Sequence, residues 1–269
     1  AEGNIDFRGD IVIHGNVESG VSIRATGSIT IDGVAEACML EAGKDIILRG
    51  GMLGGNKASV KTKGAITAKF FEFTNILCEG DLQADVLMDC SVICHGQIRL
   101  TGRKGSIIGG KVQAIRGLIA TSLGNDAEKR TEIFVGAGID VYSRLRVMEK
   151  KIETTREELT KIEEGLEKFE ILSKERGLSY TNDPRRTSLL RIKIKDSAML
   201  ASDEEEVRKL RILAESSRGA CVSVIQEIYP GVIINMDELK LALKNMATGV
   251  EFYKLPDKIG TRPCSAGVE

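Results

Sequence analysis

The chain has 269 residues, a formal net charge of −1 and 42% hydrophobic residues, so it can bury a substantial core in one or two domains. The balanced charge gives no overall attraction to nucleic acid or to a membrane surface, and no apolar run approaches the ~18 residues of a membrane span. With no tryptophan and only 4% aromatic residues, a sugar-binding groove built on aromatic platforms is not expected.

A repeated motif fills the first half of the sequence. Each copy carries apolar or small residues two and four positions before an anchor residue, and again two and four positions after it. Successive anchors are 16 to 20 residues apart. Internal repetition at such a spacing is the signature of a solenoid or an array. The seven anchors are Gly9, Gly27, Lys44, Gly64, Gly80, Gly96 and Arg116.

The spacing within and between these copies predicts a parallel β-solenoid. Alternation with period two turns one set of side chains inward and the other outward. The step between anchors is too short for a crossover helix, and a hairpin meander would not keep one directional motif in register. We therefore predict an all-β, right-handed parallel β-helix of about seven coils, in which each coil buries its inward residues by stacking on its neighbours.

Glycine at most anchors is expected where a side chain would clash or where φ is unusual. A further segment, residues 50–55 (Gly-Gly-Met-Leu-Gly-Gly), is as glycine-rich as a phosphate-binding loop. It lacks the lysine–serine ending and the following helix of a P-loop. We therefore predict a turn insertion on one face of the solenoid.

The chain carries six cysteines, of which Cys78 and Cys94 share one inward column of consecutive coils. A metal or redox pair is one interpretation, because Cys90 and His95 lie close to Cys94 in the sequence. Period two turns His95 outward, however, and no second pair has the CxxC spacing of a zinc site. We expect the cysteines to be small packing residues in a reducing cytoplasm, and we expect no metal and no cofactor.

From about residue 140 the apolar spacing changes to alternating steps of three and four, which is the seam of a coiled coil. Charged residues of both signs fill the intervening positions, as on the solvated flanks of such a helix. Gly177 and residues 182–184 (Asn-Asp-Pro) end the pattern, and Asn182 or Asp183 is the expected N-cap of the next helix. The seam positions are Leu145, Met148, Ile152, Thr155, Leu159, Ile162, Leu166 and Phe169.

A second, weaker helical pattern follows and ends at Gly219. The short break between the two patterns favours an antiparallel coiled-coil hairpin with its tip near residues 177–184. An intermolecular coiled coil is the alternative. The apolar positions of the second pattern are Leu189, Ile192, Met199, Val207, Leu210 and Leu213.

Strand character returns at residues 220–224 and 232–234. We predict that this segment forms one more coil beside residues 133–136 and caps the open edge of the solenoid. Residues 237–246 are expected to form a short amphipathic helix or a loop, and the last twenty residues to be loosely organised.

Basic side chains crowd the expected tip of the hairpin. Between residues 174 and 195 only Glu175 and Asp183 oppose them. Such a patch suits an acidic protein partner, while a solvated helix face is the plainer interpretation. Aromatic residues here are limited to Tyr180, so nucleic acid is not the expected partner. The basic residues are Lys174, Arg176, Arg185, Arg186, Arg191, Lys193 and Lys195.

Three features together resemble the bacterial flagellar assembly protein A family: repeats such as residues 27–34 (Gly-Ser-Ile-Thr-Ile-Asp-Gly-Val), the charged coiled-coil insertion, and the return segment 228–232 (Ile-Tyr-Pro-Gly-Val). The resemblance covers most of the chain. It implies a role in flagellar assembly or cell-pole organisation, and it brings no catalytic motif. The family usually carries a further N-terminal domain, which we expect to be missing from this sequence.

We predict a solenoid domain over residues 1–139 plus 219–262, with the hairpin of residues 140–218 inserted before the last coil. No constellation of residues points to an enzyme, since the two histidines, His14 and His95, are predicted outward on distant coils.

The expected function is a non-enzymatic scaffold or adaptor of the bacterial cytoplasm, with a polar position as a further expectation. Its rigid β-helix would support a projecting coiled coil that contacts protein partners or a second copy. The alternatives are a polymerising, cytoskeleton-like β-solenoid and a module that binds polyanions or lipid through the basic tip.

Overall fold

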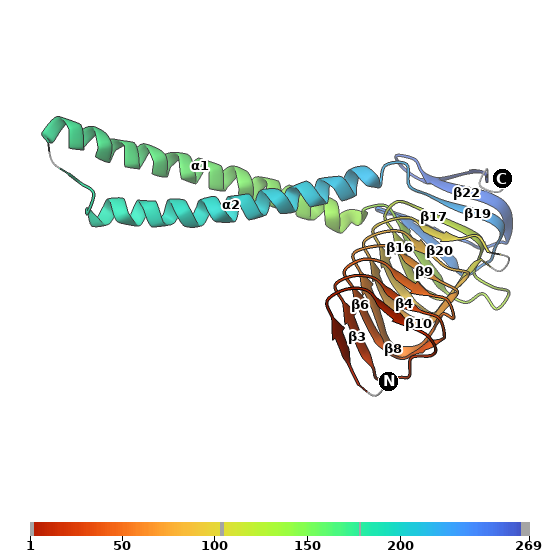
Figure 1. The fold of residues 1–269 in the computed structure, drawn as a ribbon. Coiled ribbons are helices and arrows are strands. Elements are labelled where there is room, and N and C mark those ends of the chain that lie inside the picture. Colours follow the sequence, from red (N-terminus) through yellow and green to blue (C-terminus); the bar gives the residue numbers. More distant parts are fainter. Residues whose placement is uncertain (1–2, 103–104, 178, 265–269) are drawn as a thin grey trace. The chain divides into compact units, whose positions relative to one another are not determined.

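A computed structural model describes residues 3–102, 105–177 and 179–264, and it contains a right-handed parallel β-solenoid interrupted by two long helices (Figure 1). The fold predicted from the sequence is therefore confirmed. The chain divides into two compact units, residues 1–138 with 216–269 and residues 139–215. The first unit is the solenoid, and the second is the helical hairpin.

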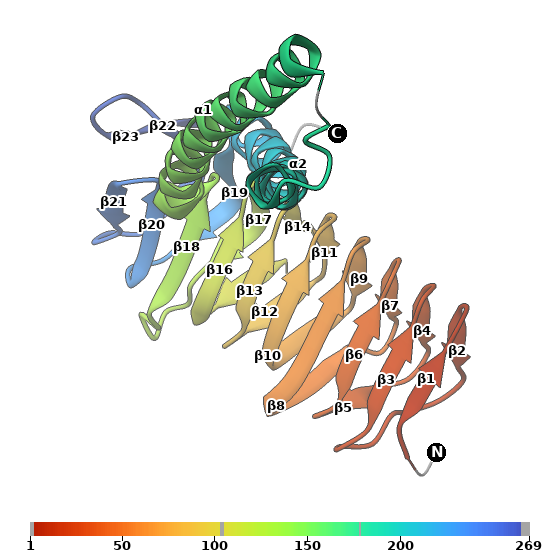
Figure 2. The ribbon, with the colours of Figure 1, turned by 90° about the vertical axis from the view of Figure 1, so that its left-hand side faces the viewer.

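Parallel strands stack along three faces of the described solenoid (Figure 2). The first face contains β1 (Ile5–Phe7), β3 (Ser22–Ala25), β6 (Met39–Ala42), β8 (Met52–Thr62), β10 (Phe70–Cys78), β13 (Ser91–Cys94), β16 (Gly110–Ala114), β18 (Thr131–Val135) and β20 (Val232–Met236). The second face contains β2 (Ile11–Ile13), β4 (Ile29–Ile31), β7 (Ile46–Leu48), β9 (Ile66–Ala68), β11 (Leu82–Gln83), β14 (Ile98–Leu100), β17 (Leu118–Leu123) and β19 (Cys221–Ile228). The third face contains β5 (Ala35–Glu36), β12 (Val86–Met88) and β15 (Ser106–Ile108), together with the opening residues of β8 and β10 and the closing residues of β17 and β19.

The register of these strands confirms the repeat that the sequence predicts. On the first face Ile23 pairs with Ile5 and with Leu40, each four residues before its anchor. The anchors themselves form a ladder of backbone hydrogen bonds, in which the N–H of each anchor from 27 to 116 donates to the carbonyl oxygen of the preceding anchor. A one-residue slip would turn the apolar columns outward, so the core and the ladder specify the same register.

Close packing between coils explains the glycines at two of the anchors. A Cβ at Gly27 would lie 2.0 Å from Oδ1 of Asp10, and a Cβ at Gly96 would lie 2.2 Å from Oδ1 of Asp81. Each of these carboxylate oxygens accepts a hydrogen bond from the backbone N–H that follows the glycine, at 2.7 Å for Asp10 and 2.8 Å for Asp81. The clash, and not an unusual φ, requires glycine at these two positions.

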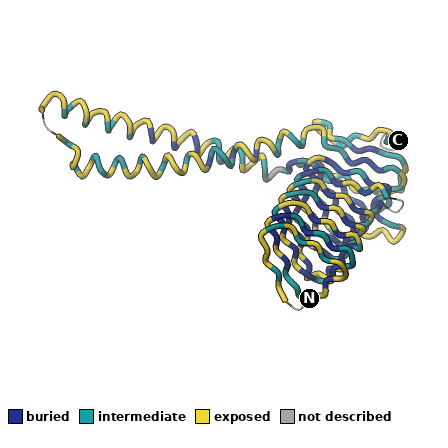
Figure 3. The backbone as a smooth tube through the Cα atoms, viewed as in Figure 1, coloured by how far each residue is buried: buried dark blue, intermediate teal, exposed yellow. Residues whose placement is uncertain are grey.

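Buried residues recur in every coil along the solenoid (Figure 3), and their side chains form one continuous apolar core. Ile29, Leu82 and Leu118 on the second face are fully buried, as is Phe71 on the third. Phe7 differs from the prediction, because it lies in an inward column but is 52% exposed. In the described residues β1 pairs with β3 alone, so its coil has a neighbour on one side only.

The glycine-rich segment contains the predicted insertion, which takes the form of a bulge within a strand. Its residues 52–55 lie in β8, which pairs with β10 along the third and first faces. A Cβ at Gly54 would lie 2.4 Å from Oγ1 of Thr74 and 2.5 Å from the carbonyl oxygen of Phe73. Leu53 pairs with Glu72 and Ala58 pairs with Thr74, so β8 contains three more residues than β10 between these pairs, and Gly55 and Asn56 among them have positive φ. The insertion therefore lies in a bulge of β8, and the close approach of β10 requires glycine at position 54.

The segment after the helices completes the solenoid as predicted, because β19 pairs with β17 and β20 pairs with β18, both in parallel. The chain then reverses direction. β21 (Leu239–Ala242) pairs antiparallel with β20, β22 (Ala247–Lys254) with β19, and β23 (Ile259–Pro263) with β22. Residues 237–246 therefore contain a strand instead of the predicted helix or loop, and the segment predicted to be loosely organised contains two strands. These strands satisfy the backbone groups at the edges of β19 and β20.

The helices α1 (Gly138–Arg176) and α2 (Pro184–Ser216) are inserted in the sequence between β18 on the first face and β19 on the second. In the preceding coils this corner holds the anchor residue. The insertion replaces one short corner turn and leaves the register of both faces intact, since β18 pairs with β16 and β19 pairs with β17.

Candidate functional site

The two helices form an antiparallel pair whose register is marked by ion pairs. The beginning of α1 meets the end of α2, as Glu149 does with Arg211, and residues farther along α1 meet earlier residues of α2, as Glu163 does with Lys193. This is the antiparallel hairpin that the sequence predicts. Opposite charges at facing positions are the usual means of fixing the register of a coiled coil. The pairs between the helices are Arg144–Glu206, Glu149–Arg211, Lys151–Asp203, Arg156–Glu204 and Glu163–Lys193.

The predicted seam of α1 faces inward where the helices pack most closely. Ile152 and Leu159 are 7% and 9% exposed, and Thr155 between them is also buried. On α2 the predicted seam residues Val207 and Leu210 are buried in the same way. This half of the hairpin therefore has an apolar core.

The other half of α2 differs from the prediction. Ile192 and Met199 are 42% and 38% exposed, although the heptad pattern places them in the seam. Lys193, Asp196 and Leu200 are the half-buried residues of this stretch, and Lys193 lies 2.8 Å from Glu163 of α1. Leu189 and Leu190 are half-buried as well, so a different side of α2 from the predicted one meets α1 here, and Ile192 and Met199 are turned to solvent.

The turn between the helices is closed by Asp183. Its Oδ1 accepts a hydrogen bond from the backbone N–H of Arg185 at 2.8 Å, and its carbonyl oxygen accepts one from the N–H of Thr187 at 3.0 Å. Asp183 is therefore the N-cap of α2, one of the two residues predicted for that role. The ring of Tyr180 lies 6.3 Å from that of Phe169, which fixes the turn against the end of α1.

A small hollow of about 230 Å³ lies at this turn. It is below the 300–1,000 Å³ that is usual for small-molecule pockets. Its lining combines two rings with two basic side chains, which suits a contact with a partner's side chain better than a buried metabolite. The lining residues are Phe169, Glu170, Ser173, Lys174, Tyr180, Thr181 and Arg186.

The structure brings only part of the predicted basic set together. Lys174, Arg176, Arg185 and Arg186 belong to the helix ends beside the turn, and three of them are exposed while Arg186 is half-buried. The other three extend along α2 for roughly 17 Å from its first residue, at about 1.5 Å per residue. Of these, Arg191 and Lys195 are exposed, whereas Lys193 is engaged by Glu163. The partner Glu163 was not predicted from the sequence, because the register between the helices was unknown.

A longer groove of about 1,080 Å³ runs between the helices. Several of its charged side chains already pair with one another, as Glu149 does with Arg211 and Arg156 with Glu204. The groove is therefore a surface feature of the helix pair and not an enclosed ligand site. Its lining residues are Glu149, Ile152, Glu153, Arg156, Glu157, Thr160, Glu204, Val207, Arg208, Arg211, Ile212 and Glu215.

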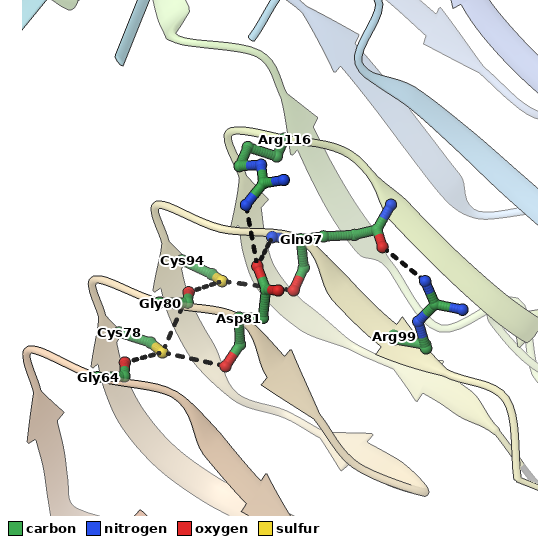
Figure 4. A network of polar contacts seen from close by, with 8 residues as sticks. All are labelled: Gly64, Cys78, Gly80, Asp81, Cys94, Gln97, Arg99 and Arg116. Atoms are coloured by element: carbon green, nitrogen blue, oxygen red, sulfur yellow. Dashed lines mark hydrogen bonds and ion pairs between the residues drawn. The ribbon is translucent and has the colours of Figure 1, made fainter. Parts of the chain in front are cut away.

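In the solenoid, Cys78 and Cys94 occupy paired positions on adjacent first-face strands (Figure 4). Both side chains are fully buried, and their sulfur atoms lie 3.3 and 3.2 Å from the carbonyl oxygen of Gly80, which can accept a hydrogen bond from either thiol. The hydrogen bond between the two thiols lowers the pKa of Cys78 and raises the pKa of Cys94. All six cysteines are free thiols, and these two pack as small core residues.

Burial is the main influence on the pKa of two further core thiols. It raises the pKa of Cys38 and of Cys90 to about 11 in each case. Both thiols therefore stay protonated near neutral pH, where a protonated thiol is a poor nucleophile and a poor metal ligand.

Carboxylates that were not predicted to have a role bridge neighbouring coils at the solenoid corner. Asp81 accepts the backbone N–H of Gln97 and lies 3.6 Å from Nη1 of Arg116 (Figure 4). The signal for these residues was available, because Asp10, Asp45 and Asp81 each directly follow an anchor and precede a glycine anchor one coil later. Their contacts are structural and link neighbouring coils.

Searches over the described ranges give two further findings. No group of three or more histidine, cysteine, aspartate or glutamate side chains there is arranged to hold a metal ion. No helix in the same ranges combines the length and apolar character needed to cross a membrane.

Comparison with known proteins identifies the family of the solenoid. The family model described as the Flagellar Assembly Protein A beta solenoid domain matches residues 1–259. Neither the curated proteins nor the solved structures contain a significant match to the chain.

Proposed function

The chain belongs to the flagellar assembly protein A β-solenoid family, and we propose that it acts in flagellar assembly as a non-enzymatic scaffold or adaptor of the bacterial cytoplasm, positioned at the cell pole. The observation that carries this proposal is that the strands on both sides of the insertion keep the pairing register of the preceding coils. A hairpin of more than seventy residues replaces one corner turn while the neighbouring strands stay paired. A fold that tolerates such an insertion without losing its core is suited to presenting a recognition element.

The recognition element in this proposal is the basic end of the hairpin. Lys174, Arg176 and Arg185 are exposed beside a turn that Asp183 and the ring contact of Tyr180 hold in place. Backbone that is already held in place loses less conformational entropy on binding than a disordered segment. The partner that fits is a protein with an acidic surface, attracted by a local excess of positive charge on an otherwise neutral chain.

Polymerisation of the solenoid, the first alternative, is disfavoured by the antiparallel strands after β20. End-to-end stacking needs free parallel edges, and β21 and β22 occupy the edges of β20 and β19. Glu251 supports this cap, since its buried carboxylate accepts hydrogen bonds from Ser223 at 2.9 Å and from Arg262 at 2.6 Å.

The cellular test is deletion of the gene in its source bacterium, followed by complementation with variants. We expect deletion to reduce the number of flagella counted by electron microscopy, and the intact gene to restore it. A version without residues 139–215 should fold as a solenoid and fail to complement. Full flagellation of the deletion strain would refute a role in assembly.

The binding test compares two variants with equal loss of charge. In the first, Lys174, Arg176, Arg185 and Arg191 are each replaced by Gln; in the second, the exposed residues Arg146, Lys150, Lys209 and Arg218 are replaced in the same way. Capture of a flagellar protein from native lysate should be lost with the first variant and retained with the second. Equal loss with both would indicate a non-specific charge effect, and binding to anionic vesicles instead of protein would favour the lipid- or polyanion-binding alternative.

A further inference from the structure

One side of α2 carries a heptad pattern that the hairpin itself does not use. Steps of three and four residues connect positions that face away from the seam, and all but the last are exposed. At its centre lie Ile192 and Met199, the two apolar residues that the sequence places in the seam and the structure turns outward. We call this set the outer stripe. Its members are Arg185, Ser188, Ile192, Lys195, Met199, Ser202 and Glu206.

The charges of α2 are divided into two blocks that meet at the middle of this stripe. Residues 185–195 contain five basic and no acidic side chains, and residues 196–206 contain five acidic and no basic ones. The boundary falls between Lys195 and Asp196. A helix of this kind is complementary to a second copy of itself when the two run antiparallel, because each basic block then faces an acidic block.

From this arrangement we propose that the outer stripe is a self-association surface, on which two chains pair through α2 in antiparallel orientation about a two-fold axis between residues 195 and 196. The axis places Ile192 opposite Met199 of the second copy, and it does so twice. The same axis places Lys195 opposite Asp196, and Arg185 opposite Glu206. A second copy is therefore the occupant that satisfies the apolar pair and the charge blocks together.

The contacts within the hairpin leave most of the stripe available. Arg185, Lys195 and the two apolar residues are exposed. Glu206 pairs with Arg144 but keeps 36% of its side chain exposed, so it can contact a second cation. Ser188 and Ser202 are small side chains on either side of the centre, which allows two helices to approach closely.

The expected association is weak and sensitive to salt. Solvent-exposed ion pairs each contribute little, and the Debye length falls from about 30 Å at 0.01 M salt to about 3 Å at 1 M. We expect the full chain to form dimers at low salt and high protein concentration, and to dissociate at 1 M salt. Sedimentation velocity of the purified chain measures both.

The apolar centre is tested with Ile192→Ser combined with Met199→Ser. The matched control is Val147→Ser combined with Ile171→Ser, which removes two exposed apolar side chains of α1 that are 68% and 48% exposed. The first variant should weaken dimerisation at least tenfold, an effect of ~1.4 kcal/mol, and the control should leave it unchanged. Equal dimerisation of the two variants would overturn the proposal.

The charge blocks are tested with two complementary variants. Lys195→Glu should prevent self-association because it places an acidic residue opposite Asp196 in both facing pairs, and Asp196→Lys should prevent it because it places a basic residue opposite Lys195 in both pairs. A mixture of the two should form heterodimers, since both facing pairs then carry opposite charges. Failure of the mixture to associate, with both variants folded by circular dichroism, would refute the antiparallel register.

The orientation is tested with single cysteines and mild oxidation of the full chain. Lys195→Cys lies one residue step from its own counterpart across the axis, and Ser188→Cys lies fifteen steps away, which is about 22 Å along the helix. Only the first should form an intermolecular disulfide above the level seen for the unmodified chain. Cross-linking of both would indicate parallel pairing and overturn the proposal.

These measurements use purified protein and are independent of partner capture. The serine variant at positions 192 and 199 leaves the basic residues of the tip in place. If it abolishes dimers and retains the captured partner, the two surfaces are separate. If dimers form but no partner is captured by any variant, the self-association stands and the adaptor function fails.

Discussion

The solenoid and the hairpin of this chain obtain their register by different means. In the solenoid, apolar columns and the anchor hydrogen-bond ladder specify the same stacking. In the hairpin, buried residues such as Ile152 and Val207 occupy one half, while the other half has only half-buried side chains and an exposed ion pair between Glu163 and Lys193. The difference shows that a backbone ladder with a continuous core defines a fold strongly, whereas a polar helix pair depends on a few contacts.

The largest effect is expected from the solenoid core. Phe71→Ala removes a fully buried ring on the third face and should cost about 3–5 kcal/mol of the free energy of unfolding. Thermal unfolding followed by the β-sheet signal in circular dichroism should shift to a markedly lower temperature. A shift no larger than that of the exposed control Leu53→Ala would contradict the stacked core.

The helix pair should respond separately to its own core substitution. Ile152→Ala should destabilise the hairpin by about 2–4 kcal/mol, with loss of helical signal at 222 nm at a lower temperature. Because the hairpin is a separate compact unit, the β-sheet transition should move little. A single transition that shifts as a whole would show that the two units unfold together.

Core thiols should make the solenoid sensitive to alkaline pH. The folded state holds the proton of Cys90 up to a pKa of about 11, against 9.0 as the reference. The free energy of unfolding is therefore unaffected by this thiol below pH 9, and it falls by roughly 2–3 kcal/mol as the pH rises from 9 to about 11. The size of this loss follows from about 1.36 kcal/mol per unit of pKa difference between the folded and unfolded states. The strand register places Cys90 in the same column as Thr74 and Ala58, so an alanine already occupies this column in another coil. Cys90→Ala should therefore fold, and it should lose less of its free energy of unfolding between these pH values. Parallel pH profiles of variant and parent would refute the assignment.

Substitution at the anchor positions should change the free energy of unfolding least, and a neighbouring anchor provides a matched control. Gly96→Ala forces a Cβ against Asp81 and the carbonyl of Gly80 and should cost about 1–3 kcal/mol in urea unfolding. Arg116→Ala, at the next anchor, removes only an exposed ion pair and should cost under ~1 kcal/mol. Equal costs would mean that the anchor residue is not selected by packing between coils.

The sequence could predict the solenoid because its signal is repeated. Apolar residues alternate with period two at the same distances from each of seven anchors, and only one stacking register superimposes all of these copies. Ile23 pairs with Ile5 and with Leu40 as that register requires. The antiparallel cap was missed because β21 and β23 occur once and have no copy in the sequence to compare with. Their pairing depends on the edges of β19 and β20, which exist only after the solenoid has formed.

The candidate site divides in the same way. The basic residues could be read from the sequence, as could Asp183 as one of two candidate caps. The seam at Ile192 and Met199 could not be predicted correctly, because apolar spacing alone does not show that Lys193 would meet Glu163. A heptad pattern identifies a helix face without identifying which chain covers it.

The sequence by itself determined the parallel solenoid, the helical hairpin and the order in which they follow one another, because each rests on a local period that side-chain burial enforces. The tertiary structure alone decided three other matters: the backbone carbonyls of the preceding coil that exclude side chains from Gly27 and Gly96, the antiparallel strands that close the edge, and the outward turn of the stripe on α2. Each of these depends on distances between residues far apart in the chain, and such distances are set only when the backbone has been packed.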